Sequence, residues 1–597
     1  MAFSGALTLT DLNDYITPSQ ACIKPVETKN APVQDAGDAS TQIHVDRDGT
    51  YYELSVSSDP TGDNAKGGGK RLEAAQVSLN DCLACSGCIT SAESVLITMQ
   101  SHIQVLDFLA ENATHELTSR NAKIPVVSVS PQSLASLAAS VSSSSTSSVT
   151  PRQILHRIEV FLNQVLGIHH VYDTTFARHV SLLEHAREFW ERKAQSASGA
   201  KGALPMLASA CPGWICYAEK THSEMLPFIS RTKSPQQVMG TIVKSWLASR
   251  WDKSPDQIYH VTVMPCYDKK LEASRQDFYN DVFSTRDVDC VITTGELELL
   301  MKEKSWDISV PVVNELVPTP PRTPPPNGSG SDIATILPQF ISHPGTSSGS
   351  YLHTIMEAVR ERHRLDTRRQ DPPDLELSIK ALRSADYEEY TLTDPETGKV
   401  VFKGAKCYGF RNLQNIVRRV GKEAGVQTGK GAAGRLVGSR SRAVKKTTAS
   451  GEDVHLDYVE VMACPGGCIN GGGQLKRREL TKASPKPRET DSEGYQRDWN
   501  ESGAEFGSDL GARWGDKEWT KEVERVYWAE RESDVPTHAG TNVFAVDVLH
   551  EMCQHAVTPG SSWSTSMDEK AEAQRRTLFR TEYRAVESEV DGLLVKW

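Results

Sequence analysis

The sequence lacks any long apolar run. No stretch of about 18 consecutive apolar residues occurs, so we expect no membrane-spanning helix and no membrane partner. The first residues contain Asp11 and Asp14 and have no continuous apolar segment, so we expect no secretory leader. These absences predict a soluble protein of the cytoplasm, with the nucleus as a second location.

Positively charged residues are fewer than negatively charged ones. Lys and Arg number 66 against 77 Asp and Glu, which gives a formal net charge of −11. Proteins that bind nucleic acids usually present a basic face, so we expect no nucleic-acid partner. The single basic stretch, residues 430–446, is rich in Gly, Ser and Thr and is interpreted as a solvated loop.

Cysteine is present in quantity, with 12 residues. Disulfides are rare in cytosolic proteins, so this number points to metal or redox chemistry. Cys82, Cys85 and Cys88 are spaced by two residues each, which lets three thiolates reach three corners of an iron–sulfur cubane. Zinc remains the alternative, although it usually takes two separated Cys-x2-Cys pairs. The nearest candidate for a fourth ligand is Cys22, whose alternative interpretation is a lone buried cysteine.

A second cysteine group follows three predicted strands, residues 204–209, 258–264 and 458–462. These strands are followed by Cys211, by Cys266 and by the pair Cys464 and Cys468, and each group has an adjacent proline. Ligands collect at the carboxyl ends of parallel strands, so these distant thiols are expected to converge. The alternative is a set of buried structural cysteines beside a glycine-rich turn.

Strands and helices alternate along the chain, which predicts an α/β fold with a largely parallel sheet. Residues 124–129 predict a short buried strand, and the serine-rich stretch 140–148 is interpreted as a flexible loop. Thr150, Pro151 and Gly167 predict a helix from Pro151 to about Leu166. We divide the chain into an N-terminal iron–sulfur segment (1–120), a first α/β lobe (121–310), a Pro/Gly/Ser-rich insertion (311–350), a second α/β lobe with cluster cysteines (351–475), a polar and mostly irregular insertion (476–567), and a C-terminal helix and tail (568–597). In that last part, Phe579, Tyr583, Val586 and Val590 have helical spacing and predict a docking stripe.

Four stretches resemble iron-only hydrogenases: VYDTTFARHVSLLEHAREF (171–189), SACPGW (209–214), MPCYDKKLEA (264–273) and EVMACPGGCINGGGQ (460–474). Within that superfamily the sequence resembles the cytosolic iron–sulfur assembly factors and prelamin-A-recognition-factor-like proteins. The resemblance implies a two-lobed parallel-sheet core with an N-terminal cluster segment and a C-terminal helical segment. It also implies two 4Fe–4S clusters, held by Cys22, Cys82, Cys85 and Cys88 and by Cys211, Cys266, Cys464 and Cys468.

The resemblance further implies a function in cytosolic iron–sulfur assembly, with the early scaffold and the late targeting complex as partners. Hydrogenases carry a proton-relay cysteine where this sequence has Ala210, so we expect no enzyme activity. Lys269 and Met264 are retained, and a hydrogenase-type oxidoreductase or electron carrier is the alternative function. The C-terminal Trp597 resembles the tail by which clients dock on the targeting complex, although Lys596 departs from the acidic preference. Four further cysteines are interpreted as structural, namely Cys216, Cys290, Cys407 and Cys553.

Overall fold

The computed structural model describes residues 41–45, 51–55, 70–71, 96–115, 121–144, 148–199, 202–313, 315, 337–366, 373–382, 385–423, 455–477, 517–529, 538–553 and 568–585. The predicted first-cluster ligands and the C-terminal tail lie outside these residues. The chain divides into two units, Met1–Ser78 and Leu79–Trp597. The first unit contains a small antiparallel sheet of β1 (Thr41–Val45), β2 (Tyr51–Ser55) and β3 (Lys70–Arg71).

The second unit contains a four-stranded sheet in the order β10-β7-β4-β5, and all of its pairs are parallel. Its strands are β4 (Ile124–Val129), β5 (His170–Asp173), β7 (Ile258–Met264) and β10 (Cys290–Thr293). Every residue of β7 is buried, as expected for a strand covered on both faces. The predicted strands at 124–129 and 258–264 are confirmed to the residue.

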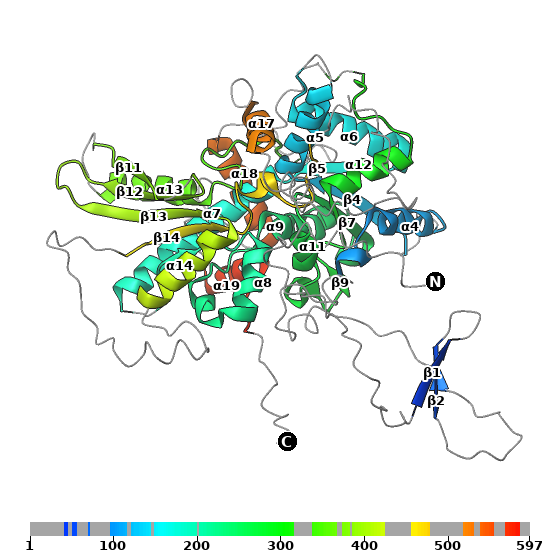
Figure 1. The fold of residues 1–597 in the computed structure, drawn as a ribbon, viewed down its shortest axis with the longest axis horizontal. Helices are drawn as coiled ribbons and strands as arrows, with labels where there is room; N and C mark the ends of the chain where they lie inside the picture. The colour runs from blue at the N-terminus through cyan, green and yellow to red at the C-terminus, as the bar shows by residue number, and fades with distance from the viewer. Residues whose placement is uncertain are drawn as a thin grey trace, which may run out of the picture. The chain divides into compact units, whose positions relative to one another are not determined.

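Helices cover both faces of this sheet (Figure 1). Val127 and Val129 pack with α4 (His102–Asn112), α5 (Pro131–Ser144), α6 (Pro151–Leu166) and α12 (Thr294–Glu303). Val126 faces the other way, toward α7 (Thr175–Ala197), α9 (Pro235–Thr241) and the π-helical stretch η2 (Ile242–Leu247), which continues into α10 (Ala248–Arg250). Strand alternation therefore separates two apolar cores.

Local signals set the ends of α6. The Thr150 hydroxyl accepts from the Gln153 N–H, and the Gln153 side chain accepts from the Thr150 N–H, so both capping interactions are present. Pro151 occupies the first helical position, where no N–H is needed. Gly167 ends the helix in the left-handed region at φ 69°. The predicted helix from Pro151 to Leu166 is confirmed.

A five-stranded sheet forms the second lobe, in the order β11-β12-β13-β14-β6. Its strands are β11 (Glu376–Ala381), β12 (Tyr387–Thr393), β13 (Val400–Tyr408), β14 (Tyr458–Met462) and β6 (Met206–Leu207). The first two pairs are antiparallel and the last two are parallel. Helices α8 (Pro212–Thr221), α13 (Tyr351–Asp366) and α14 (Phe410–Glu423) pack on it.

The two lobes share elements. Strand β6 lies between first-lobe elements in sequence, yet it pairs with β14 of the second sheet. Helix α7 reaches both cores, because Phe176 and Val180 pack with α9 whereas Leu182 and Phe189 pack with the second sheet. Shorter elements follow β7, namely α11 (Asp268–Ala273), β8 (Tyr279–Asn280) and β9 (Thr285–Arg286).

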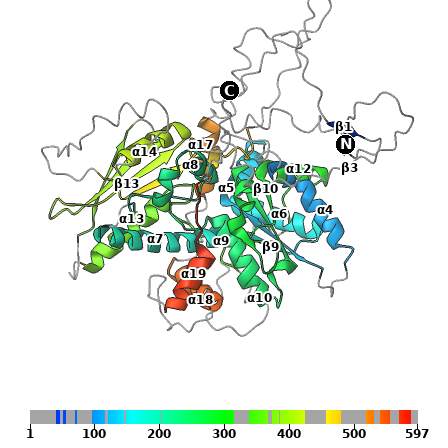
Figure 2. The same ribbon diagram turned by 90° about the horizontal axis from the view of Figure 1, so that it is seen from below.

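The described residues of the last part of the chain form three helices, namely α17 (Lys517–Trp528), α18 (His538–Cys553) and α19 (Glu569–Phe579). The prediction that residues 476–567 are mostly irregular is wrong for α17 and α18. Val523 and Val526 are buried in the core that contains α5, and Leu549 is buried in the core that contains α9. Figure 2 shows α18 and α19 side by side. A few apolar residues on a polar helix suffice when a neighbouring core covers them.

Two further predictions need correction. The serine-rich stretch 140–148, interpreted as a flexible loop, begins inside α5, which continues to Ser144 because its buried face belongs to the first-lobe core. The C-terminal helix ends at Phe579, and Arg580 is extended and bridges to Thr232. Tyr583 therefore lies beyond the helix and packs on the second-lobe core, while Val586 and Val590 lie outside the described residues. No helix in the described part of the chain is long and apolar enough to cross a membrane.

Candidate four-cysteine centre

Three parallel strands place the cysteines of the second group. Leu207 of β6 pairs with Val459 of β14, so these strands end side by side and bring Cys211 and Cys464 to the same edge. Cys211 is the N-cap of α8. Cys266 comes from the other sheet, two residues after the end of β7, and Cys468 begins a short 3-10 turn. The centre is thus assembled from both sheets.

Glycines let the two cysteine loops pack closely. The Gly473 N–H donates to the Pro265 carbonyl at 2.9 Å. A Cβ at Gly471 would lie 2.3 Å from that carbonyl oxygen and 3.3 Å from the Cβ of Cys266. The loop after Cys468 therefore rests directly on the loop that carries Cys266, and a side chain at Gly471 would separate them.

Gly467 is constrained both by its backbone angle and by its contact with Ser348. Its φ of 81° lies in the left-handed region, and a Cβ there would come within 2.1 Å of Ser348 Oγ. The same Ser348 hydroxyl accepts from the Cys468 N–H at 3.0 Å. The packing of Gly467 against Ser348 and this hydrogen bond together fix the orientation of the Cys468 backbone. Its Sγ lies 3.8 Å from Met462 Sδ.

Cys211 is buried and the other three cysteines are half-buried, and their charges interact with one another. Burial raises the pKa of Cys211 to about 12, and Cys468 and Asp268 add to that increase. Burial also raises the pKa of Cys266, of Cys464 and of Cys468. Neighbouring thiols contribute in the same direction at Cys266 and Cys464. Four thiolates here would need a positive centre among them, which iron supplies.

One backbone group favours the thiolate form. The Ala463 N–H donates to Cys211 Sγ at 3.4 Å, and this bond opposes the increase in the Cys211 pKa. Hydrogen bonds of this kind tune iron–sulfur centres. Among the described residues, no three His, Cys, Asp or Glu side chains are arranged to hold a single metal ion. A cubane differs from a single ion, because each thiolate binds its own iron atom.

Lys269 is the buried cation beside the cysteines. Its Nζ donates to Glu272 Oε2 at 2.9 Å and to the Ala210 carbonyl at 3.1 Å. Burial disfavours its charged form, but the Glu272 carboxylate outweighs burial and the pKa of Lys269 is raised. Glu272 also accepts from Ser234 Oγ and Gln236 Nε2. The ammonium is therefore held in place by a carboxylate that is itself fixed.

Sequence reasoning missed Ser348, because it lies in the stretch interpreted as an insertion (311–350). The structure places residues 337–350 against the core, where Gln132 Nε2 donates to the Ser347 carbonyl at 2.7 Å. It also missed Asp268, whose charge acts on three of the cysteines. Asp268 stands inside the recognised MPCYDKKLEA stretch, which was the available signal; nothing in the sequence around Ser348 marks that residue.

Known protein families and individual relatives resemble this chain in sequence. The family described as "Iron only hydrogenase large subunit, C-terminal domain" matches residues 123–472. A Cryptococcus neoformans protein named "Cytosolic Fe-S cluster assembly factor NAR1" is 44% identical, over 99% of this chain and 98% of the relative. The chain belongs to the family of cytosolic iron–sulfur cluster assembly factors.

Other members of this assembly-factor family agree over their whole length. The Mus musculus "Cytosolic iron-sulfur assembly component 3" is 40% identical, over 100% of this chain and 99% of the relative. These relatives are named as assembly factors and not as enzymes. The predicted family is confirmed.

A solved structure agrees on the fold. The [FeFe]-hydrogenase HydA1 from Chlamydomonas reinhardtii covers 81% of this chain with 99% of its own, at a TM-score of 0.53 and 21% identity. At that identity the likeness concerns the fold alone, and it confirms the predicted hydrogenase-like α/β class. A hydrogenase-like fold in turn implies iron–sulfur clusters, without giving their number or type.

Proposed function

We propose that this chain is a component of cytosolic iron–sulfur protein assembly that carries two 4Fe–4S clusters and links the early scaffold to the late targeting complex. Its relatives are named as cytosolic assembly components at 37–44% identity over the full chain. The observation that carries the proposal is the convergence of four thiols from two sheets, one buried and three half-buried. That donor set has the ligand chemistry of an iron–sulfur cluster.

We assign the second cluster to Cys211, Cys266, Cys464 and Cys468. For the first cluster we propose Cys22, Cys82, Cys85 and Cys88, on the ferredoxin-like spacing of three of them. A bound cluster supplies iron for the thiolates and the capacity to accept an electron. The protein's part is to bury the thiols, donate the Ala463 N–H to Cys211, and hold Lys269 nearby.

Ala210 favours assembly over hydrogen chemistry. Its methyl group cannot carry a proton, and its carbonyl is occupied by Lys269 Nζ. The Lys269 ammonium is in turn paired with Glu272. We therefore propose that the chain is not a hydrogenase. Hydrogen evolution from anaerobic protein and a reduced dye measures this directly, and sustained turnover would replace assembly with the oxidoreductase alternative.

Metal analysis of single-cysteine variants tests the ligand assignment. Cys464→Ala or Cys468→Ala should lose about half of the iron and acid-labile sulfide and should accumulate to a lower level, because cluster binding is coupled to folding. Cys216→Ala is the matched control, since Cys216 lies on α8 close to Cys211 but is not assigned as a ligand. Unchanged iron in Cys464→Ala, or zinc in place of iron in the parent protein, would refute the assignment.

Partners are proposed from the same family membership. Other cytosolic assembly proteins are the expected class, and the Val595-Lys596-Trp597 tail is proposed as one docking element. A chain that lacks Trp597 should retain its iron but bind the targeting complex more weakly in a pull-down. Loss of iron together with binding would assign the tail to folding instead.

A further inference from the structure

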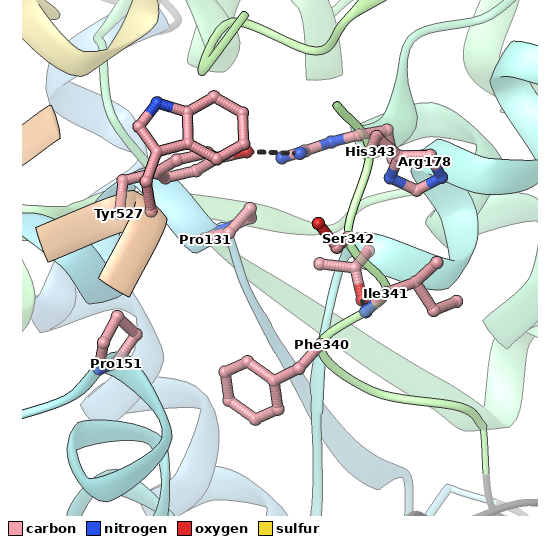
Figure 3. Close-up of a pocket in the computed structure, with 10 residues that line it drawn as sticks. Pro131, Pro151, Arg178, Phe340, Ile341, Ser342, His343 and Tyr527 are labelled. Atoms are coloured by element: carbon pink, nitrogen blue, oxygen red, sulfur yellow. Dashed lines mark hydrogen bonds between the residues drawn. The ribbon is translucent and has the colours of Figure 1, made fainter. Parts of the chain in front are cut away.

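A pocket opens where three helices begin (Figure 3). Pro131, Pro151 and Thr175 line it, and they are the first residues of α5, α6 and α7. Helix N-termini carry partial positive charge, so three of them at one pocket favour a negatively charged occupant. The pocket is separate from the four cysteines, none of which lines it.

A buried guanidinium faces the same pocket. Arg178 belongs to the first turns of α7 and is only 3% exposed. Within the described residues, it has one hydrogen-bond acceptor, the Tyr527 hydroxyl at 2.5 Å, and no carboxylate within ion-pair distance. Its remaining N–H donors make no hydrogen bond within the described residues, so they are available to an anion in the pocket.

Asp173, whose charge interacts with Arg178, makes its hydrogen bonds to other groups. Asp173 Oδ1 accepts from the Thr175 N–H and hydroxyl, at 2.8 and 2.6 Å, and its Oδ2 accepts from the Phe340 N–H at 2.6 Å. Both oxygens are therefore used to fix the start of α7 and the loop opposite. A second cation, Arg152, lies 4.5 Å from the centre of the Phe340 ring.

The remaining walls are largely apolar and aromatic. Phe340 and Ile341 come from the loop before α13, and Tyr527 and Trp528 come from the end of α17. Pockets that combine such walls with a few polar anchors are typical small-molecule sites. The charge of Arg178 and the aromatic walls together define the ligand.

We propose that this pocket binds a small organic anion, whose carboxylate or phosphate pairs with Arg178 and whose flat apolar body lies against Phe340, Tyr527 and Trp528. Arginine suits this role, because its planar fork binds a carboxylate through two parallel hydrogen bonds.

Binding of benzoate to the full-length, anaerobically purified protein tests the proposal. Calorimetry should show benzoate binding at least tenfold more tightly than benzamide, which lacks the charge, and than acetate, which lacks the ring. Arg178→Met should weaken benzoate at least tenfold and leave benzamide unchanged, whereas Arg178→Lys should keep the preference. Arg250→Met is the control, since Arg250 pairs with Glu551 at an exposed site.

Three results would overturn the proposal. These are equal affinity for benzoate and benzamide, no benzoate binding in the millimolar range, or undiminished benzoate affinity in a folded Arg178→Met variant. If that variant does not fold, Trp528→Ala replaces it and should weaken benzoate by shortening the aromatic wall. Inorganic phosphate that binds as tightly as benzoate would likewise overturn the requirement for an apolar body. None of these outcomes depends on the cluster assignment, which is tested separately by the iron content of the cysteine variants.

Discussion

At the scale of single residues, the centre depends on positions where no side chain fits. Gly467 and Gly471 let two cysteine loops approach each other and Ser348. The cysteines are the proposed ligands, and the glycines allow the loops that carry them to pack closely. A cysteine pattern without these glycines would not assemble the same site.

Gly467→Ala tests this close approach. With φ 81° and ψ −160°, Gly467 lies in a region that is essentially restricted to glycine and costs alanine roughly 1–3 kcal/mol, and the clash with Ser348 should add roughly 1–3 kcal/mol. We expect lower iron content and a lower unfolding midpoint in urea. Gly398→Ala is the matched control, because Gly398 has a φ of 66° with open space around it. Equal effects of the two variants would show that packing against Ser348 is unimportant.

His185 predicts a pH dependence of stability. It is buried between Tyr458 and Ser230, with ring nitrogens 2.8 and 3.1 Å from their hydroxyl oxygens. Burial lowers its pKa to about 4, with Arg192 and Arg580 acting in the same direction and Glu188 opposing them. In the unfolded chain the pKa is about 6.5, so between these values the unfolded state binds the extra proton.

The contribution of His185 is therefore complete above about pH 6.5 and is lost as the pH falls toward 4, on the order of 3 kcal/mol in total. Urea unfolding at pH 7 and pH 5 should show a smaller pH dependence for His185→Gln than for the parent. His169→Gln, at an exposed position, is the control. Parallel pH profiles in all three proteins would contradict the prediction.

At the scale of elements, buried ion pairs attach the C-terminal helix. Arg575 on α19 pairs with Glu184 on α7, and both side chains are fully buried. Arg580, just beyond the helix, also pairs with Glu184 and with Glu191. The helix is polar on average, so these charges and Phe579 do much of the docking.

Arg575→Met should destabilise the protein by roughly 3–5 kcal/mol, because it leaves Glu184 buried with one partner fewer. Differential scanning calorimetry would show this as a lower Tm. Arg576→Met is the neighbouring control, since its side chain is 55% exposed. A Tm unchanged by Arg575→Met would mean that Arg580 alone neutralises Glu184.

At the scale of the whole molecule, the proposed second cluster joins the two lobes. Cys266 comes from the four-stranded sheet, whereas Cys211 and Cys464 follow strands of the five-stranded sheet. A cluster held by all of them would act as a covalent link between the sheets. The contact between Gly473 and Pro265 is the protein's own link at the same place.

Removing iron with a chelator under anaerobic conditions should therefore loosen this junction first. Hydrogen exchange should increase roughly tenfold or more in residues 264–273 and 458–474, because local opening there becomes easier. Residues 151–166 of α6, which are distant in the first-lobe core, should change little. A uniform increase over all three segments would indicate global destabilisation and contradict a cluster at the junction.

The sequence by itself determined the local elements, and it supplied the cysteines that we propose as ligands. Pro151 and Gly167 bound α6, the strands at 258–264 and 458–462 are as predicted, and a cysteine follows each of these strands. Such signals are local, because capping groups and strand periodicity act over a few residues. The four hydrogenase-like stretches were also recognised from the sequence alone.

Tertiary structure alone decided the rest. The pairing of β6 with β14, the place of Ser348 beside Cys468, and the meeting of three helix N-termini at Arg178 all join segments that are far apart in the sequence. Helix α17 is polar on average, and it is held because its few apolar residues are covered by a core that is distant in sequence. Burial and strand pairing are non-local, so no window of the sequence contains the partners that determine them.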